Sequence, residues 1–285
     1  MKIKNYLSLV KFNHTLFALP FAIVGFFMAI GFYGFQFSIL QFILVVLCMF
    51  FARNAAMAFN RIVDKSWDGI NERTSRREIP QGIIKPQNAL IFVIINMFAF
   101  WIATFFINTV CFLLSPVALG IILSYSYTKR FTFLCHFILG IGLGLAPIGA
   151  FIAVSGEFKL FPILIGIAVW AWVSGFDIIY ALQDIDFDRQ NKLFSIPAKF
   201  GAKGAFLISR VMHIISGLTI IATFFLYLNN SVFYSIAALV FNLLLIYQHS
   251  IISPNNMKRI NFAFFNLNGV ASVIFAVFAV LGFFF

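Results

Sequence analysis

The chain has 285 residues, of which 62% are hydrophobic and 10% charged, and its mean hydropathy is +1.00. Soluble domains carry about 25% charged residues. A water-soluble globule cannot hide this much apolar surface, because much of its surface must still face water. A soluble enzyme, a disordered chain and a fibrous protein are therefore excluded, and the length is better counted in membrane spans of ~20 residues each.

Nine apolar segments follow one another along the chain, and each is long enough to be a membrane-spanning helix. Their predicted bounds are Thr15–Tyr33, Ser38–Phe59, Asn88–Asn108, Phe112–Tyr127, Phe133–Val154, Phe161–Ala181, Ala205–Leu228, Val232–Ile251 and Phe262–Phe284. The links after the first, third, fifth and seventh segments are short and nearly uncharged, whereas the others are longer or charged. We predict an all-α polytopic membrane protein, one domain over residues 1–285, with nine transmembrane helices around a central cavity.

The positive charge lies almost entirely on one side of these predicted spans. The formal net charge is +11, which in a soluble protein would suggest a nucleic-acid partner. However, 18 of the 20 Lys and Arg residues fall on the side of the N-terminus, while Lys159 lies opposite and Arg53 lies inside the second span. This is the positive-inside bias of a membrane protein, so no nucleic-acid partner is expected. From this charge asymmetry we predict that the N-terminus and the active-site loops are cytoplasmic. Because the start resembles neither a cleavable signal nor a mitochondrial transit peptide, we predict a bacterial plasma (inner) membrane rather than an organelle.

Eight of the nine acidic residues form two clusters at the same predicted membrane face. A spacing of four residues, which places side chains on one helix face, recurs in both clusters. Its members are Asn60, Asp64 and Asp68 in the first cluster and Tyr180, Asp184 and Asp188 in the second. The two sets are offset by 120 residues, and each is followed by an Ile-Pro pair. We interpret this as a weak internal repeat that places two equivalent helices at one pocket.

Carboxylates four residues apart on a helix repel one another, and a hard divalent cation between them would remove that repulsion. Mg²⁺ prefers oxygen ligands, takes one or two carboxylates per site and bridges to phosphate oxygens. The pattern predicts Mg²⁺ bound to a diphosphate, with remaining phosphate charge neutralised by Arg77, Lys129 and Arg130. The carboxylates concerned are those of Asp64, Asp68, Asp184 and Asp188. The alternative is that these acids simply pair with loop cations at the membrane surface.

Two further charges lie deeper in the predicted spans. Arg53 lies inside the second span, where an arginine costs roughly 2.5–3.5 kcal/mol on insertion scales, so it must face a cavity or a partner. It is either an anchor for an anionic substrate or the partner of Asp177 in a structural salt bridge. Asp177, inside the sixth span, either pairs with Arg53 or Tyr180, or orients or deprotonates a substrate.

Three elements of the sequence together resemble the signatures of UbiA-type prenyltransferases. They are Asn60-x3-Asp64-x3-Asp68 followed by Arg73-Thr74 and Arg77-x2-Pro80-x-Gly82; Tyr180-x3-Asp184-x3-Asp188 followed by Ser195 and Phe200-Gly201; and Tyr125-x3-Lys129-Arg130-x-Thr132. With their spacing and the nine spans, the resemblance covers nearly the whole chain. Within that family, the chain most resembles 4-hydroxybenzoate polyprenyltransferase-like proteins of quinone synthesis, including the branch associated with menaquinone.

The resemblance implies Mg²⁺-dependent transfer of a polyprenyl group from polyprenyl diphosphate to an aromatic acid acceptor, 4-hydroxybenzoate or a related acid, within the lipid bilayer. It implies catalytic roles for Asp177, Tyr180 and Arg53, with Arg53 suited to the acceptor's carboxylate. The implied substrate-binding set is Arg53, Arg77, Lys129, Arg130 and Lys192. The implied metal ligands are Asn60, Asp64, Asp68, Asp184 and Asp188. Alternatives are another acceptor within the family, such as haem or a naphthoate, and, outside it, a cation-coupled membrane transporter.

The sequence departs from the family's pattern at three positions. Arg61 stands where many members have Asp, and Glu78 stands where Pro is usual. Phe194 replaces a basic residue that often precedes the serine, so the second loop lacks one candidate cation for diphosphate. Lys192 and Lys199 are the two candidates that would compensate for it.

Overall fold

The computed structural model describes residues 3–10, 18–254 and 256–285. The described part is helical and contains no β-strand, only an isolated bridge between Ser253 and Asn256. In chain order, its elements are α1 (Ile3–Leu9), α2 (Leu19–Gly31), α3 (Ile39–Val63), α4 (Lys65–Ile70), α5 (Pro86–Ile107), α6 (Thr109–Thr128), α7 (Cys135–Ser155), α8 (Leu160–Ala181), the 3-10 turn η2 (Leu182–Asp184), α9 (Ile185–Gln190), α10 (Ile196–Tyr227), α11 (Val232–Ile251), the π-helical η3 (Phe262–Leu267) and α12 (Asn268–Phe284).

Within the described residues, eight helical segments are long and apolar enough to cross a membrane, and they match eight of the nine predicted spans. The predicted first span, Thr15–Tyr33, overlaps α2, a shorter apolar helix of 13 residues. Residues 15–17 of that prediction lie outside the described residues. The predicted all-α polytopic membrane protein is thus confirmed, with eight full-length spans and α2 as a shorter ninth helix in the described part.

The helices begin where side chains satisfy free backbone N–H groups. Ser38, Asn108, Ser195 and Ser231 each accept a hydrogen bond from the backbone N–H three residues further on, at 2.8–3.4 Å. Proline occupies the first turn of α2, α5 and α10, where its missing N–H costs nothing. In lipid every backbone polar group must find a partner within the protein, so these ends define where each span begins.

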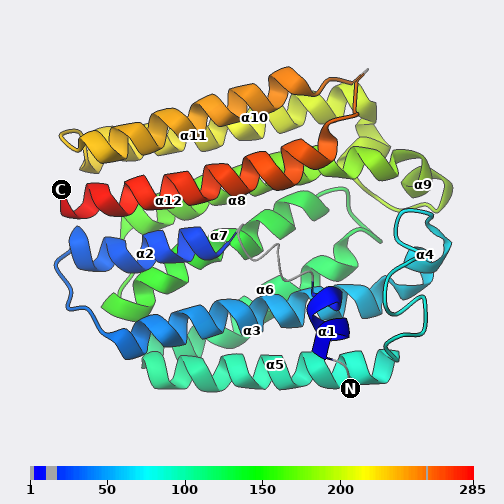
Figure 1. Ribbon diagram of the computed structural model, residues 1–285, viewed down its shortest axis with the longest axis horizontal. Coiled ribbons are helices and arrows are strands. Elements are labelled where there is room, and N and C mark those ends of the chain that lie inside the picture. The colour runs from blue at the N-terminus through cyan, green and yellow to red at the C-terminus, as the bar shows by residue number, and fades with distance from the viewer. Residues whose placement is uncertain (1–2, 11–17, 255) are drawn as a thin grey trace.

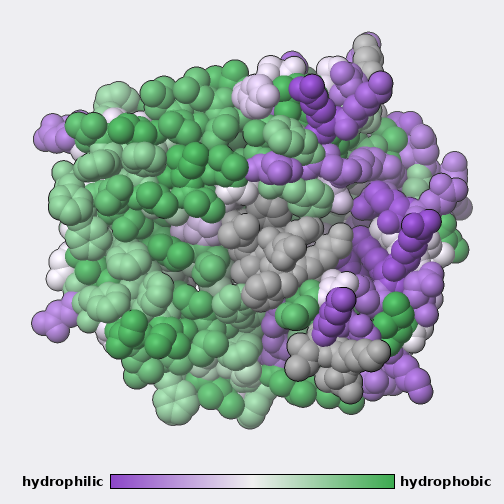
Figure 2. Space-filling view, in the orientation of Figure 1, coloured by the Kyte–Doolittle hydropathy of each residue, from purple (hydrophilic) through white to green (hydrophobic). Residues whose placement is uncertain are grey.

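The long helices lie side by side along the long axis of the molecule, and the short helices α4 and α9 lie together at one end (Figure 1). Hydrophilic residues gather at this same end, whereas the rest of the visible surface is largely hydrophobic (Figure 2). Apolar side chains such as Phe98, Phe105 and Leu113 are exposed on the outside of the bundle, as expected for a surface that faces lipid. Both acidic clusters therefore lie at the polar end, as the repeat predicts.

Small residues bring α7 and α8 into close contact. A Cβ atom on Gly144 would lie 2.7 Å from the carbonyl oxygen of Gly166, and one on Gly140 would lie 2.5 Å from that of Trp170. Glycines at such positions allow two helix backbones to approach in a membrane. On the other side of α8, the fully buried Trp172 donates its indole N–H to Asn268 of α12 at 3.1 Å. These contacts fix α8, the helix that carries Asp177 into the interior.

Candidate active site

Each acidic cluster is built from a long helix that ends beside a six-residue helix. At the first, α3 ends at Val63, Asp64 lies in the break and Asp68 lies in α4. At the second, α8 ends at Ala181, Asp184 closes η2 and Asp188 lies in α9. The change of helix direction thus places one aspartate in each break and one just after it, at the polar end of the bundle.

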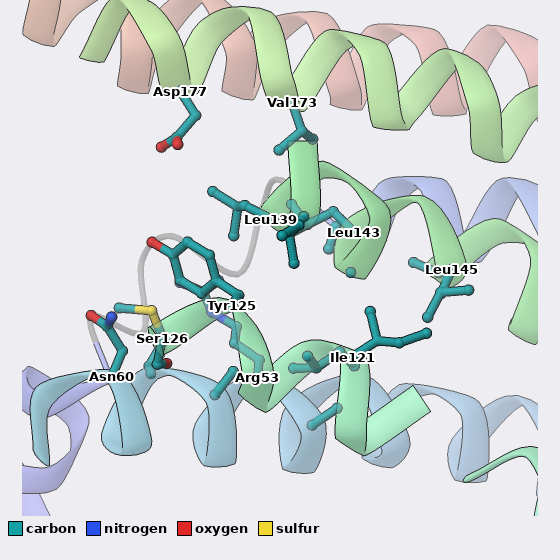
Figure 3. A pocket seen from close by; sticks show the side chains of 18 of the residues that line it. Arg53, Asn60, Ile121, Tyr125, Ser126, Leu139, Leu143, Leu145, Val173 and Asp177 are labelled. Carbon is teal, nitrogen blue, oxygen red and sulfur yellow. The ribbon is translucent and has the colours of Figure 1, made fainter. Parts of the chain in front are cut away.

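A cavity of about 590 Å³ runs from this end into the bundle. Ten of the twelve site residues predicted from the sequence line it: Arg53, Asn60, Asp64, Asp68, Arg77, Lys129, Arg130, Asp177, Tyr180 and Asp184. Figure 3 shows Arg53 and Asn60 of α3, Tyr125 of α6 and Asp177 of α8 around one space, which continues between apolar side chains such as Leu143 and Ile121. The fold therefore brings residues from distant parts of the chain to one cavity with a polar mouth and an apolar interior.

Two predicted residues do not line the cavity. Asp188 is fully buried behind Lys129, whose Nζ lies 2.6 Å from its Oδ1, and Ser195 donates a hydrogen bond to its Oδ2 at 2.8 Å. Lys192 is exposed just beyond α9 and adopts a left-handed backbone conformation, with φ 55°. Lys199, the other compensating candidate, lies over the Phe133 ring at 3.6 Å and does not line the cavity either. The structure thus gives no support to the assignment of Lys192 or Lys199 to substrate.

The first acidic cluster is paired with basic residues of the cavity mouth. Arg77 Nη1 lies 2.6 Å from Asp68 Oδ1, and Arg130 Nη2 lies 3.4 Å from Asp64 Oδ1. Asn60 donates its side-chain N–H to Asp64 Oδ2 at 3.0 Å. Asp68 Oδ2 is buried and has no hydrogen-bond partner among the described residues. This cluster therefore keeps one buried carboxylate oxygen that is available to a further ligand.

The second cluster is joined to the loop of the first by Arg73. Its Nε donates to Asp184 Oδ1 at 3.0 Å and its Nη2 contacts Asp184 Oδ2, so the two groups form a bidentate pair. Arg73 Nη1 also donates to the Tyr180 hydroxyl at 3.2 Å, and Asn71 donates to Asp184 Oδ1 at 3.1 Å. Tyr180 in turn stacks on Phe264, with ring centroids 4.0 Å apart. Arg73 and Asn71 therefore link the two acidic helix ends directly.

Burial and neighbouring charge tune the ionisation of the groups at the mouth. Burial, and then the negative charge of Asp68, raise the pKa of Asp64 to about 6, although Arg130 and Lys129 oppose this. Burial alone would lower the pKa of Lys129, but its ion pair with Asp188 outweighs that effect and holds the pKa above its usual value. Lys129 therefore stays charged at neutral pH, whereas the surroundings of Asp64 disfavour its ionised form.

The donor chemistry at the mouth suits a hard divalent cation. Among the residues that the structure describes, no three His, Cys, Asp or Glu side chains are arranged to hold a metal ion. Asp64, Asp68, Asp184 and Asp188 are each paired with a basic side chain instead. Carboxylate and amide oxygens are nevertheless the ligands Mg²⁺ prefers, and Asp68 Oδ2 has no partner. The cations that now hold the carboxylates are also those that phosphate oxygens attract. By their chemistry, the residues present at the mouth therefore fit a divalent cation and a phosphate group.

Asp177 lies deeper in the cavity, and its partner is a residue that the sequence reasoning did not single out. His136 Nδ1 lies 2.7 Å from Asp177 Oδ2. Arg53 lies across the cavity from Asp177 (Figure 3). One feature of the sequence points to His136: it lies at the polar end of an apolar segment, four residues before Gly140 and on the same helix face.

Arg61 is a second residue of the cavity that sequence reasoning treated only as a departure from a family pattern. Its side chain lines the cavity and is buried, with 6% of the residue exposed. It donates a hydrogen bond from Nη1 to Asn60 Oδ1 at 3.0 Å. A buried guanidinium at this place adds positive charge next to the first acidic cluster, where Lys192 and Lys199 add none.

Comparisons with known proteins agree with this fold. The UbiA prenyltransferase family matches residues 18–270. The 4-hydroxybenzoate octaprenyltransferases of Escherichia fergusonii and Enterobacter sp. are 31% and 30% identical, over 78% of this chain and 76% of each relative. A UbiA homologue from Aeropyrum pernix K1 is 33% identical over 94% of this chain and 97% of its own, with a TM-score of 0.84. A UbiA homologue from Archaeoglobus fulgidus, bound to GPP and Mg²⁺, shares the fold at 18% identity, with a TM-score of 0.75 over 98% of this chain and 99% of its own.

The fold and the site define a polytopic helical membrane protein in which two acidic helix ends meet at the mouth of one cavity. The chain belongs to the UbiA prenyltransferase family, which matches most of its length. The resemblance inferred from the three sequence motifs is thereby confirmed.

Proposed function

We propose that this protein transfers a polyprenyl group from polyprenyl diphosphate to an aromatic acid, 4-hydroxybenzoate or a related acceptor, in quinone biosynthesis. The observation that carries the proposal is the cavity itself. Four aspartates and four basic side chains are paired at one end of the bundle, and an apolar space continues from there between the helices. Such a site suits a substrate with a charged head and a long hydrocarbon tail.

The metal is proposed to be Mg²⁺, held by Asn60, Asp64 and Asp68 of the first cluster and Asp184 and Asp188 of the second. The donor set supports this, because it is made of oxygens only and includes the unpartnered Asp68 Oδ2. Asp188 lies one side chain behind the cavity and would take part once Lys129 turns to a phosphate oxygen. Bound Mg²⁺ supplies Lewis-acid stabilisation of the charge that develops on the leaving diphosphate.

The basic residues of the mouth are proposed to bind the diphosphate. Arg77, Lys129 and Arg130 all line the cavity, and Arg73 lies among them. When the allylic C–O bond breaks, its electron pair leaves with the diphosphate, and fixed cations stabilise that charge at little reorganisation cost. The apolar walls of the cavity exclude water from the allylic cation, which would otherwise be hydrolysed.

The acceptor is proposed to bind deeper, between Arg53 and Asp177. Arg53 would take the carboxylate of the aromatic acid, because the cations of the mouth already suffice for phosphate. A ring carbon would form the new bond to the allylic carbon, and the acceptor would lose one proton to the Asp177 carboxylate. Tyr180, which contacts Arg73 next to Asp184, would orient the substrates at the level where the two meet.

The test is direct transfer by the purified protein in lipid nanodiscs. Labelled geranyl diphosphate is supplied with Mg²⁺ and a panel of acceptors that contains 4-hydroxybenzoate, a hydroxynaphthoate and haem. We expect a prenylated aromatic acid and an equal amount of released diphosphate, both abolished by EDTA. Transfer to haem alone, or diphosphate release without a prenylated product, would overturn the proposed acceptor. Transport of a cation without transfer would overturn the proposed function.

We further propose that the protein lies in a bacterial plasma membrane with its N-terminus and the polar end of the cavity in the cytoplasm. The support is the location of 18 of the 20 Lys and Arg residues on this side. Ser66→Cys and Gln190→Cys, placed at the two acidic helix ends, should react with a membrane-impermeant maleimide only from the cytoplasmic side. Labelling of these two positions from opposite sides would contradict this topology.

A further inference from the structure

A histidine and an aspartate form a buried pair on the cavity wall, where the first turn of α7 packs against α8. His136 lies in the first turn of α7 and Asp177 in the last turns of α8. The distance from His136 Nδ1 to Asp177 Oδ2 is 2.7 Å, and both residues line the cavity. His136 has 3% of its surface exposed, whereas 18% of the Asp177 side chain is exposed. The histidine is therefore behind the carboxylate, and the carboxylate is the member of the pair that a substrate reaches.

The close packing of α7 on α8 holds this pair together. His136, Gly140 and Gly144 are four residues apart and share one face of α7. They lie against α8, where Gly144 meets Gly166, Gly140 meets Trp170 and Ser174, and His136 meets Asp177. The Ser174 hydroxyl donates to the carbonyl oxygen of Trp170 at 2.7 Å and to that of His136 at 3.4 Å. The two glycines thus set the distance between the helices that the histidine and aspartate bridge.

The second nitrogen of His136 is also engaged, which defines what the ring does. The backbone N–H of Ile196, the first residue of α10, donates to His136 Nε2 at 3.4 Å. Since Nε2 accepts, Nδ1 carries the proton and donates it to Asp177 Oδ2. The ring is held from both ends, so it fixes one oxygen of the Asp177 carboxylate on a side chain that lines the cavity.

We propose that His136 is a positioning residue for the reaction, which acts by holding the Asp177 carboxylate in the orientation that receives the acceptor's proton. This inference rests on the proposed function, in which Asp177 takes that proton. The histidine keeps its own Nδ1 proton, and the acceptor's proton passes only to Asp177. His136 does not touch the prenyl diphosphate, whose binding groups lie at the mouth of the cavity.

The experiment compares His136→Leu, His136→Asn and His136→Gln in nanodiscs, with geranyl diphosphate and 4-hydroxybenzoate as substrates. Loss of a hydrogen bond to a charged group typically lowers a rate by about 10- to 100-fold. We expect His136→Leu to lower kcat by this factor and to leave the KM for geranyl diphosphate unchanged. The side-chain amide of asparagine reaches the place of Nδ1 and that of glutamine the place of Nε2. His136→Asn should therefore recover most of the turnover, and His136→Gln should not.

A double-mutant cycle with Asp177→Asn separates positioning from a general structural effect. If His136 acts through Asp177, adding His136→Leu to Asp177→Asn lowers kcat no further. Gly140→Ala, which would push α8 away, should lower kcat as His136→Leu does. Gly120→Ala is the matched control, because Gly120 lies outside the cavity lining and an added Cβ there meets nothing within 4 Å.

Three results would overturn the inference while the proposed function stands. They are an active His136→Leu enzyme with unchanged kcat, equal turnover by the Asn and Gln variants, and multiplicative losses in the double mutant. If His136→Leu does not accumulate as folded protein, the comparison of Asn with Gln decides. A wild-type protein that transfers no prenyl group to any aromatic acid overturns the proposed function and this inference with it.

Discussion

The two acidic helix ends have the same construction. One carries Asp64 and Asp68, and the other carries Asp184 and Asp188. A long helix stops, the first aspartate lies in the break, and a helix of six residues carries the second aspartate. The short helices, Lys65–Ile70 and Ile185–Gln190, are offset by 120 residues, as are the aspartates themselves. Two segments with little other identity thus reproduce one backbone plan, which indicates that the plan serves the placement of the carboxylates.

The surroundings of the two ends differ. At the first, the Asp64 side chain is 31% exposed and its ion pair with Arg130 is 3.4 Å long. At the second, Asp184 is gripped by Arg73 of the other loop, and Asp188 is fully buried between Lys129 and Ser195. The second end is therefore fixed at both aspartates, whereas the first end, where Arg77 holds the buried Asp68 at 2.6 Å, is adjustable at Asp64. Equal spacing along a helix does not imply equal freedom of the carboxylates.

This comparison predicts equal losses of activity but unequal losses of stability. Asp64→Ala and Asp184→Ala should each lower turnover by at least about 100-fold, because each removes a proposed ligand of the Mg²⁺ ion, and such an ion contributes several kcal/mol to lowering the barrier. Asp184→Ala should also lower the melting temperature, since it leaves Arg73 without its partner, whereas Asp64→Ala should change it little. Turnover and thermal unfolding in detergent would be measured on the same preparations.

The matched control is Glu157→Ala, which removes the one acidic residue at the opposite end of the bundle. Its ion pair with Lys159 is largely exposed, so neither turnover nor melting should change. Wild-type turnover in the presence of EDTA would show that the acidic ends serve another purpose.

Arg53, which lies deeper in the cavity, offers a comparison with the two acidic helix ends. Arg53→Leu should raise the KM for 4-hydroxybenzoate by about 10- to 100-fold, as expected for a lost charge-assisted bond of ~1.5–3 kcal/mol. The KM for prenyl diphosphate should hold, because the cations of the mouth remain. With phenol, which has no carboxylate, wild type and Arg53→Leu should be equally poor. Weaker diphosphate binding with an unchanged KM for the aromatic acid would assign Arg53 to the other substrate.

Arg73 is the link between the two ends, and its removal should loosen both. Arg73→Leu leaves the Asp184 carboxylate, which is 10% exposed, with a lone amide donor from Asn71. An unpaired and partly buried charge costs about 2 kcal/mol after allowance for solvent, which lowers the melting temperature by several degrees. Arg76→Leu, an exposed neighbour, should have no such effect. If both variants melt like the wild type, Arg73 does not hold the ends together.

The helical architecture and most of the residues that line the cavity mouth could be predicted from the sequence, because both depend on local patterns. Apolar segments of sufficient length define spans in lipid, and a spacing of four residues places Asp64 beside Asp68 whatever the tertiary fold. The repeat then identified Asp184, and a charge inside an apolar span identified Arg53 and Asp177. The predicted first span extended beyond the 13 residues of α2 in the described part, since apolar composition alone does not mark where a helix begins.

The partners of these residues depend on tertiary contacts, which no local pattern contains. His136 meets Asp177 only because two glycines let α7 approach α8. Arg73 reaches across to Asp184 from a loop whose path the sequence does not define. The same limit explains Lys192, whose charge and position in the second loop suggested a substrate contact, although its side chain is exposed beyond α9. Composition can locate the charges along the chain, but it cannot assign them to pairs.

The smallest effect concerns the two glycines that follow the Ile-Pro pairs of the two loops. Both adopt left-handed backbone conformations, with φ 69° at Gly82 and 70° at Gly201. Gly201 also has ψ 177° within α10, a region that is essentially restricted to glycine. We expect Gly201→Ala to destabilise the protein by about 1 kcal/mol more than Gly82→Ala, a difference of roughly 2–4 °C in melting temperature. Gly120→Ala, which removes a glycine from a helix interior without a positive φ, should not destabilise at all. If Gly82→Ala is the more damaging of the pair, the loop after the first acidic end is the more rigid one, which would reverse the assignment of fixed and adjustable ends.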